Sequence, residues 1–172
     1  MDTALELKQL MLRAPRLTLA AAESLTCGRV QALVGEVSGA SEFFLGGITA
    51  YSLEEKVRHL GVKRAEAKRV KCVSAAVAAQ MARGACALFG SDLGVATTGY
   101  AEPAPVDGVA EPFAWWAVAW RDGRGEFSMR HGRVECPGAK RVAAQEMVAA
   151  AALAELVAWL RERRAKPQRS CQ

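Results

Sequence analysis

Long apolar runs and aromatic residues are scarce in this sequence of 172 residues. No apolar run reaches the roughly 20 residues that a membrane-spanning helix needs. The first residues have neither the basic start nor the long apolar centre of a secretion signal. These absences predict a cytoplasmic protein with no membrane partner. The apolar share is nevertheless 51%, much of it alanine, which is enough to bury the core of one domain.

Metal-binding and disulfide patterns are also missing. The five cysteines are scattered along the chain and never spaced as CxxC, and the only two histidines are His59 and His131. An odd number of widely spaced cysteines does not suit a disulfide framework, and so few histidines do not suit a zinc centre. The sequence therefore predicts no metal held by the protein and no cofactor.

Positive charge is concentrated at the end of the chain. The formal net charge is +5, but the stretch 161–172 holds five basic residues against Glu162 alone, so the remainder carries only +1. We predict one domain over 1–164 and a flexible basic tail over 165–172. A nucleic-acid binder acting through the tail is an open alternative. Nucleic acid is not the expected partner, because the body is nearly neutral and offers no stacking platform of aromatic residues.

Apolar periodicity predicts strands and helices in alternation, followed by a β-hairpin. Compact apolar runs indicate strands, and apolar stripes with capping residues at their start indicate helices. The predicted strands are 17–22, 43–51, 93–97, 113–120 and 126–134, and the predicted helices are 4–13, 29–37, a segment after Ser52, a segment that begins at Ser74, and 139–163. This order predicts an α/β fold, a three-layer sandwich in which helices cover both faces of a mixed β-sheet.

Two predicted strands end in polar, glycine-containing loops, Glu23–Gly28 and Thr97–Gly99. Open α/β sheets bind ligands beyond the carboxyl ends of their strands, and a helix that follows such a loop offers N–H groups to a phosphate. Neither loop matches a known phosphate-binding fingerprint. Ordinary strand-to-helix turns, with Ser24 or Thr26 as the helix N-cap, are the alternative.

A third candidate site consists of Ser41, Tyr51 and Lys56. A serine can attack an amide when a base removes its proton, and a lysine kept neutral by burial can be that base. A nearby tyrosine can relay the proton or orient the substrate. Spacing alone leaves open that these residues cap, pack and contact solvent, as such residues usually do.

The order of motifs from residue 22 to residue 99 resembles the C-terminal domain of the competence/damage-inducible protein CinA. The resemblance is carried by AESLTCG at 22–28, SGASEFFLGGITAYS at 38–52, EKV at 55–57, LGV at 60–62 and ATTG at 96–99. Stand-alone members of that family are nicotinamide mononucleotide amidohydrolases, which convert the mononucleotide and water to nicotinic acid mononucleotide and ammonia. The resemblance therefore implies a hydrolase whose partner is a small pyridine mononucleotide.

The resemblance also implies roles for individual residues. It implies that Ser41 is the nucleophile, Lys56 its base and Tyr51 an assisting residue. The residues that it implies contact the substrate are Glu23, Ser24, Thr26 and Gly28 in the first loop, Thr98 and Gly99 in the second, and Lys140 before the last helix.

The chain departs from the family pattern after Gly99. Where the family has a glycine-rich stretch, this chain has YAEPAPV at 100–106, which introduces prolines and the negative charge of Glu102. A GDR-type motif is replaced by Gly138-Ala139-Lys140-Arg141, in which Lys140 or Arg141 could supply the positive charge. Two functions fit: an active amidohydrolase with an altered substrate preference, and a catalytically degenerate paralogue that acts as a nucleotide-binding or regulatory module.

The spacing also sets a geometric condition. A straight strand between Ser41 and Tyr51 would hold them about 25 Å apart, at roughly 3.3 Å per residue. The sequence therefore predicts either a kink at Gly46-Gly47 or an active site shared between two subunits. We expect a homodimer or a higher homo-oligomer.

Overall fold

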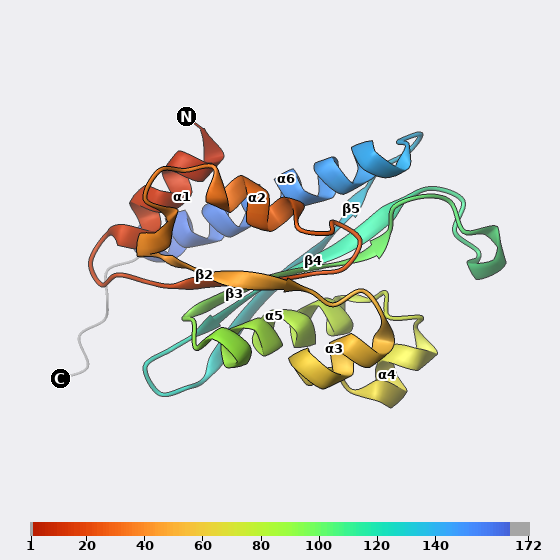
Figure 1. Ribbon diagram of the computed structural model, residues 1–172, viewed down its shortest axis with the longest axis horizontal. Coiled ribbons are helices and arrows are strands. Elements are labelled where there is room, and N and C mark those ends of the chain that lie inside the picture. The colour runs from red at the N-terminus through yellow and green to blue at the C-terminus, as the bar shows by residue number, and fades with distance from the viewer. Residues whose placement is uncertain (1, 166–172) are drawn as a thin grey trace.

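A computed structural model describes residues 2–165, which form one open five-stranded sheet with helices on both faces (Figure 1). The strands are β1 (Leu19–Glu23), β2 (Phe44–Thr49), β3 (Leu93–Tyr100), β4 (Phe113–Arg121) and β5 (Phe127–Glu135). The helices are α1 (Thr3–Leu12), α2 (Arg29–Gly35), α3 (Leu53–Leu60), α4 (Arg64–Arg69), α5 (Ala75–Phe89) and α6 (Arg141–Ala165), with short 3₁₀ turns η1 (Ala40–Glu42) and η2 (Pro105–Asp107).

The sheet is mixed, in the order β2-β1-β3-β4-β5. β1 runs parallel to both β2 and β3, whereas β4 and β5 are antiparallel additions. The carboxyl ends of β1, β2 and β3 therefore meet at one edge of the sheet. The loops that follow these three strands are brought together there, as the doubly wound arrangement requires.

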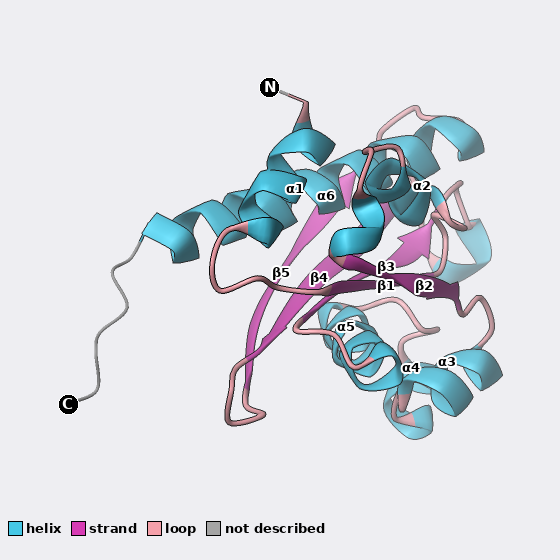
Figure 2. Ribbon diagram, turned by 60° about the vertical axis from the view of Figure 1, so that its left-hand side comes forward, coloured by secondary structure: helices cyan, strands magenta, loops and turns pink. Residues whose placement is uncertain are grey.

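Each face of the sheet has its own apolar core. α1, α2 and α6 cover one face, and α3, α4 and α5 lie on the other (Figures 1 and 2). Side chains alternate along β1, so that Leu19 and Ala21 belong to the first core and Ala20 and Ala22 to the second. The predicted three-layer α/β sandwich is confirmed.

Small residues let α5 approach the sheet and α3 closely. A Cβ atom on Gly94 would lie 2.0 Å from the carbonyl oxygen of Ala82, and one on Gly84 would lie 2.2 Å from that of Leu60. Both helices begin at a serine N-cap, because Ser52 accepts a hydrogen bond from the N–H of Glu55 and Ser74 from that of Val77. This close packing fixes the position of α3.

The long helix α6 packs against the sheet and α1. By length and composition alone it could cross a membrane, but half of its apolar window is buried in the fold, as in the core helix of a soluble protein. Its terminal arginines are engaged: Arg161 donates to Glu6, Arg164 donates to the carbonyl of Pro15, and Arg163 lies over the rings of Trp120 and Trp159. These residues are part of the helix and not of a frayed end. Residues 166–172 of the predicted tail lie outside the described part of the chain.

Candidate functional site

Lys56 lies buried in α3, just beyond the carboxyl end of β2, and contacts Ser24. Its side chain is only 1% exposed. Its Nζ lies 2.9 Å from Ser24 Oγ and donates to the backbone carbonyls of Ala50 and Tyr51, at 2.8 Å each. Ser24 follows β1 and Lys56 follows β2, so the two parallel strands bring together residues that are 32 positions apart.

Burial shifts the chemistry of Lys56. Desolvation lowers the pKa of its ammonium group from the ordinary value of 10.5, since a buried site disfavours the charged form. In the neutral form, two N–H groups can serve the carbonyls of Ala50 and Tyr51, while the nitrogen lone pair accepts the hydroxyl proton of Ser24. The arrangement therefore pairs a serine hydroxyl with an amine that can take its proton.

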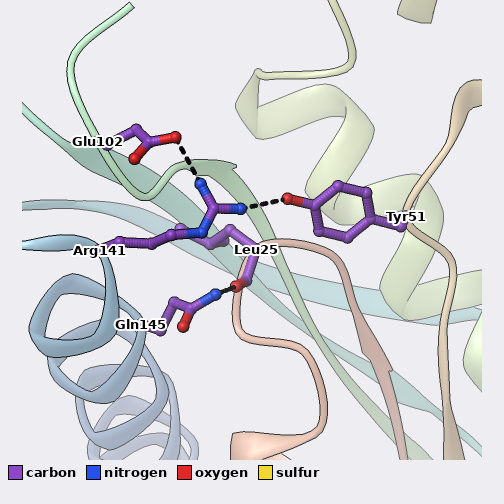
Figure 3. A network of polar contacts seen from close by, with 5 residues as sticks. All are labelled: Leu25, Tyr51, Glu102, Arg141 and Gln145. Carbon is purple, nitrogen blue, oxygen red and sulfur yellow. Dashed lines mark hydrogen bonds and ion pairs between the residues drawn. The ribbon is translucent and has the colours of Figure 1, made fainter.

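Tyr51 links this pair to α6 through Arg141 (Figure 3). Arg141 is in the first turn of α6, and its Nη2 donates to the hydroxyl of Tyr51 at 2.8 Å. Its Nη1 donates to the carboxylate of Glu102 at 2.6 Å. Tyr51 is 54% exposed, so this network lies at the surface above the buried Lys56.

Gln145 holds the loop that carries Ser24. It is buried one turn further along α6, and its Nε2 donates to the carbonyl of Leu25 at 2.7 Å (Figure 3). Leu25 itself is buried against the start of α6 in a small apolar cluster. The side chain of Gln145 thus connects α6 to the loop after β1, which carries Ser24, and the side chain of Arg141 connects α6 to Tyr51, which follows β2.

Glu23 is fully buried and serves the protein itself. Its carboxylate accepts hydrogen bonds from the N–H groups of Gly28, Val30 and Gln31 at 2.9–3.2 Å and from the hydroxyl of Thr26 at 2.6 Å. This side chain therefore caps the first N–H groups of α2. Because Glu23 and these N–H groups bind each other, they are not available for the predicted contact with a nucleotide. The N-cap residue is Gly28, in a left-handed conformation, and not Ser24 or Thr26.

The other predicted contact residues are also engaged within the protein. Thr26 shares a hydrogen bond of 2.7 Å with Thr97, and Thr98 donates to the carbonyl of Cys72 at 2.7 Å. A Cβ atom on Gly99 would lie 2.3 Å from the carbonyl oxygen of Phe113, so close packing of β3 on β4 requires a glycine there. Lys140 is exposed before α6, and its neighbour Arg141 makes the contacts with the site.

Ser41 lies at the opposite end of β2. It is exposed in η1, before the strand begins, whereas Tyr51 and Lys56 follow the strand. The pairing of β2 with β1 shifts register between Leu19 and Ala20 but continues to Glu23 and Thr49. β2 is therefore irregular at the predicted place, because the pairing skips Leu45 and Gly46 has a φ of 131°. The strand does not fold back, however, and Ser41 and Tyr51 lie beyond its two ends. Ser41 could join Lys56 only across a subunit interface, which stays a prediction.

Sequence reasoning missed three relationships in this site. It assigned Ser24 to substrate contact and not to Lys56, it chose Lys140 over Arg141, and it gave no role to Gln145. The sequence did contain a signal for the contact between Ser24 and Lys56. Ser24 and Lys56 both follow predicted strands, and the ends of neighbouring parallel strands lie at one edge of a sheet.

Among residues 2–165, no group of three or more His, Cys, Asp or Glu side chains could hold a metal ion. A hollow of about 400 Å³ lies between α2 and α6 and is lined by residues other than the predicted site residues: Arg29, Ala32, Leu33, Glu36, Glu146, Ala149 and Ala150.

Known proteins are similar to this chain in both sequence and fold. Residues 2–160 match the family model of the CinA C-terminal domain. A CinA-like protein of Picosynechococcus is 46% identical over 112 residues, which are 65% of this chain and 26% of that protein. The chain thus spans about a quarter of the length of that relative.

Solved structures superpose over nearly the whole chain. A CinA superfamily protein from Enterobacter cloacae has a TM-score of 0.80 at 28% identity, covering 92% of this chain and 90% of that one. The competence damage-inducible protein A from Klebsiella pneumoniae has a TM-score of 0.81 at 27% identity, covering 93% and 96%. The chain belongs to the CinA C-terminal domain family.

Proposed function

We propose that this chain is an amidohydrolase that cleaves a carboxamide by a serine–lysine mechanism, with Ser24 as the nucleophile and Lys56 as its base. The observation that carries the proposal is the 2.9 Å contact between Lys56 Nζ and Ser24 Oγ in a buried setting that lowers the pKa of the lysine. Residues 2–160 match the CinA C-terminal domain family, and the resemblance to its stand-alone members, which are amidohydrolases, is the reason for expecting a carboxamide substrate. Nicotinamide mononucleotide, which the resemblance implies, is the first substrate to test.

The first half of the reaction is acyl transfer to the serine. Neutral Lys56 removes the proton from Ser24 Oγ as the oxygen attacks the amide carbon, and the carbonyl oxygen becomes an oxyanion. In the described part of the chain, no hydrogen bond engages the backbone N–H of Leu25 or Thr26. These neighbours of Ser24 can stabilise the oxyanion. The lysine then returns the proton to the departing nitrogen, and ammonia leaves.

The second half restores the enzyme. Lys56 is neutral again after ammonia has left and can deprotonate a water molecule, which attacks the acyl group on Ser24. The carboxylic acid is released and the serine regains its proton. Tyr51 and Arg141, which lie at the surface above this pair, serve to orient the substrate.

The test measures ammonia release from nicotinamide mononucleotide by the wild type, Ser24→Ala and Ser41→Ala. We expect Ser24→Ala to lose activity by on the order of 10³-fold or more, while Ser41→Ala stays within about twofold of the wild type, because it lies outside the site. Both variants should melt close to the wild-type temperature. A Ser24→Ala protein that keeps its activity, with loss in Ser41→Ala, would instead support a site shared between subunits.

A catalytically degenerate module that binds a nucleotide or regulates another protein is the second candidate. The feature that favours it is YAEPAPV at 100–106, where the family has a glycine-rich stretch. Stabilisation of the wild type by the mononucleotide in a thermal melt, with no ammonia released, would favour this candidate over the amidohydrolase.

A further inference from the structure

The loop 101–109, between β3 and β4, carries two acidic residues that each neutralise a cation from another element. Glu102 accepts from Arg141 of α6, and Asp107 accepts from Lys71 of the turn between α4 and α5. Asp107 also accepts from the hydroxyl of Tyr100 at 3.0 Å, and the hydrogen bond from Lys71 is the largest cause that lowers the pKa of its carboxyl group. Both cations thus face carboxylates supplied by this one loop.

Glu102 is connected to the proposed catalytic pair by a short chain of contacts. Arg141 joins the carboxylate of Glu102 to the hydroxyl of Tyr51 (Figure 3). The carbonyl of that same Tyr51 accepts from Lys56. The side chain of Glu102 is 57% exposed and that of Arg141 45% exposed, so a bound substrate can reach both. Glu102 therefore lies on the exposed side of the site, beside Arg141 and Tyr51, and this exposed side is called the entrance below.

This placement decides which charge the entrance accepts. A guanidinium group at a site entrance ordinarily binds phosphate or carboxylate oxygens in a fork of hydrogen bonds. Here one arm of the fork already binds Glu102, and the other binds Tyr51. A phosphomonoester that bound Arg141 would have to displace the carboxylate of Glu102 and then lie beside it, which like-charge repulsion opposes. An uncharged or cationic group meets neither obstacle.

We infer that Glu102 is a specificity-determining residue, which makes the site prefer a carboxamide substrate without a phosphate over the corresponding phosphomonoester. The inference rests on the proposed amidohydrolase function and narrows its substrate class. For pyridine carboxamides it selects the nucleoside, whose ring is a cation, over the mononucleotide, which adds a phosphate dianion. The pair of Asp107 and Lys71 acts in the same direction, because it neutralises a second cation that could have attracted the phosphate.

The experiment compares nicotinamide riboside with nicotinamide mononucleotide on the wild type, Glu102→Gln and Glu126→Gln. Glu126 lies in the β4–β5 hairpin, beyond the other end of β4, and gives the same change of charge on an exposed residue. Ammonia release gives kcat/KM for each substrate, and calorimetry gives each Kd. We expect the wild type and Glu126→Gln to favour the riboside by about tenfold, and Glu102→Gln to shift that ratio about tenfold toward the mononucleotide.

A double variant tests the route of the effect. In Glu102→Gln/Arg141→Gln the gain for the mononucleotide should disappear, because the freed guanidinium is what binds the phosphate. A wild type that prefers the mononucleotide, or a Glu102→Gln ratio unchanged within about twofold, would overturn the inference. If neither amide is hydrolysed, the proposed function fails, and the Kd values decide the inference alone. Failure of every variant to bind either compound would overturn it too.

Discussion

A serine and a lysine lie near each end of β2, but only at the carboxyl end does the lysine contact the serine through a hydrogen bond. At the carboxyl end, Lys56 is buried and contacts Ser24 and two backbone carbonyls. At the amino end, beside the exposed Ser41, Lys8 reaches from α1 to donate to the carbonyl of Ser38 at 2.7 Å and lies 3.7 Å from the carboxylate of Glu42.

The difference lies in the surroundings of each lysine and not in its spacing along the chain. Lys8 is partly exposed and has a carboxylate as a partner. The partners of Lys56 are neutral oxygens, and burial lowers its pKa. A lysine becomes a base where its charge is disfavoured, and the proposed function therefore assigns serine activation to the carboxyl end of β2.

The largest effect is expected when the lysine at each end of β2 is replaced by arginine. Arginine keeps a positive charge at all working pH values and cannot act as a base. Lys56→Arg should therefore lose at least about a thousandfold in kcat/KM for amide hydrolysis, while Lys8→Arg stays within about twofold, because it lies at the other end of the strand. Equal losses in the two variants would show that the two ends are not functionally distinct.

The pH dependence of the wild-type activity also tests whether Lys56 is the base. Because activity needs neutral Lys56, kcat/KM should rise with pH through the pKa of Lys56, and this limb should lie below the ordinary lysine value of 10.5. Lys8→Arg should leave the limb in place. A rising limb centred at or above 10.5 would contradict the assignment of Lys56 as a desolvated base.

A smaller effect is expected from the contact that holds the Ser24 loop. Gln145→Met keeps the approximate volume but leaves the buried carbonyl of Leu25 without its donor. The free energy of unfolding should fall by about 1–3 kcal/mol, and kcat should fall about tenfold as the loop loosens. Denaturant melts and ammonia release measure the two effects.

The matched control lies on α5, where Gln80 makes hydrogen bonds to Lys63 and Glu66 near the surface. Gln80→Met should cost less stability, because the groups that it leaves can bind water, and it should leave kcat unchanged. Loss of activity in Gln80→Met that equals the loss in Gln145→Met would remove the special role of Gln145.

Much of the fold was predictable from local patterns. The apolar runs predicted all five strands to within a few residues, and serine caps marked the starts of α3 and α5. The site was predictable only in part, because its contacts join distant segments. Which serine meets Lys56 depends on strand direction: Ser24 follows a strand that runs parallel to β2, whereas Ser41 precedes β2.

The sequence also could not predict which of two adjacent residues faces the site. The choice between Lys140 and Arg141 depends on the rotation of the first turn of α6, which no local pattern specifies. Glu23 has the composition of a ligand contact, but the left-handed conformation of Gly28 directs α2 back onto its carboxylate. Polar residues beyond strand ends can thus satisfy the backbone as readily as they bind a substrate.

The most direct measurement locates the activated serine. Wild-type protein is treated with a fluorophosphonate, which reacts with serine hydroxyls that a neighbouring base deprotonates, and peptide mass spectrometry then identifies the labelled residue. The prediction is a label on Ser24 that disappears in Lys56→Arg and persists in Lys8→Arg. A label on Ser41, with Ser24 unmodified, would contradict the assignment of the carboxyl end of β2 as the active site.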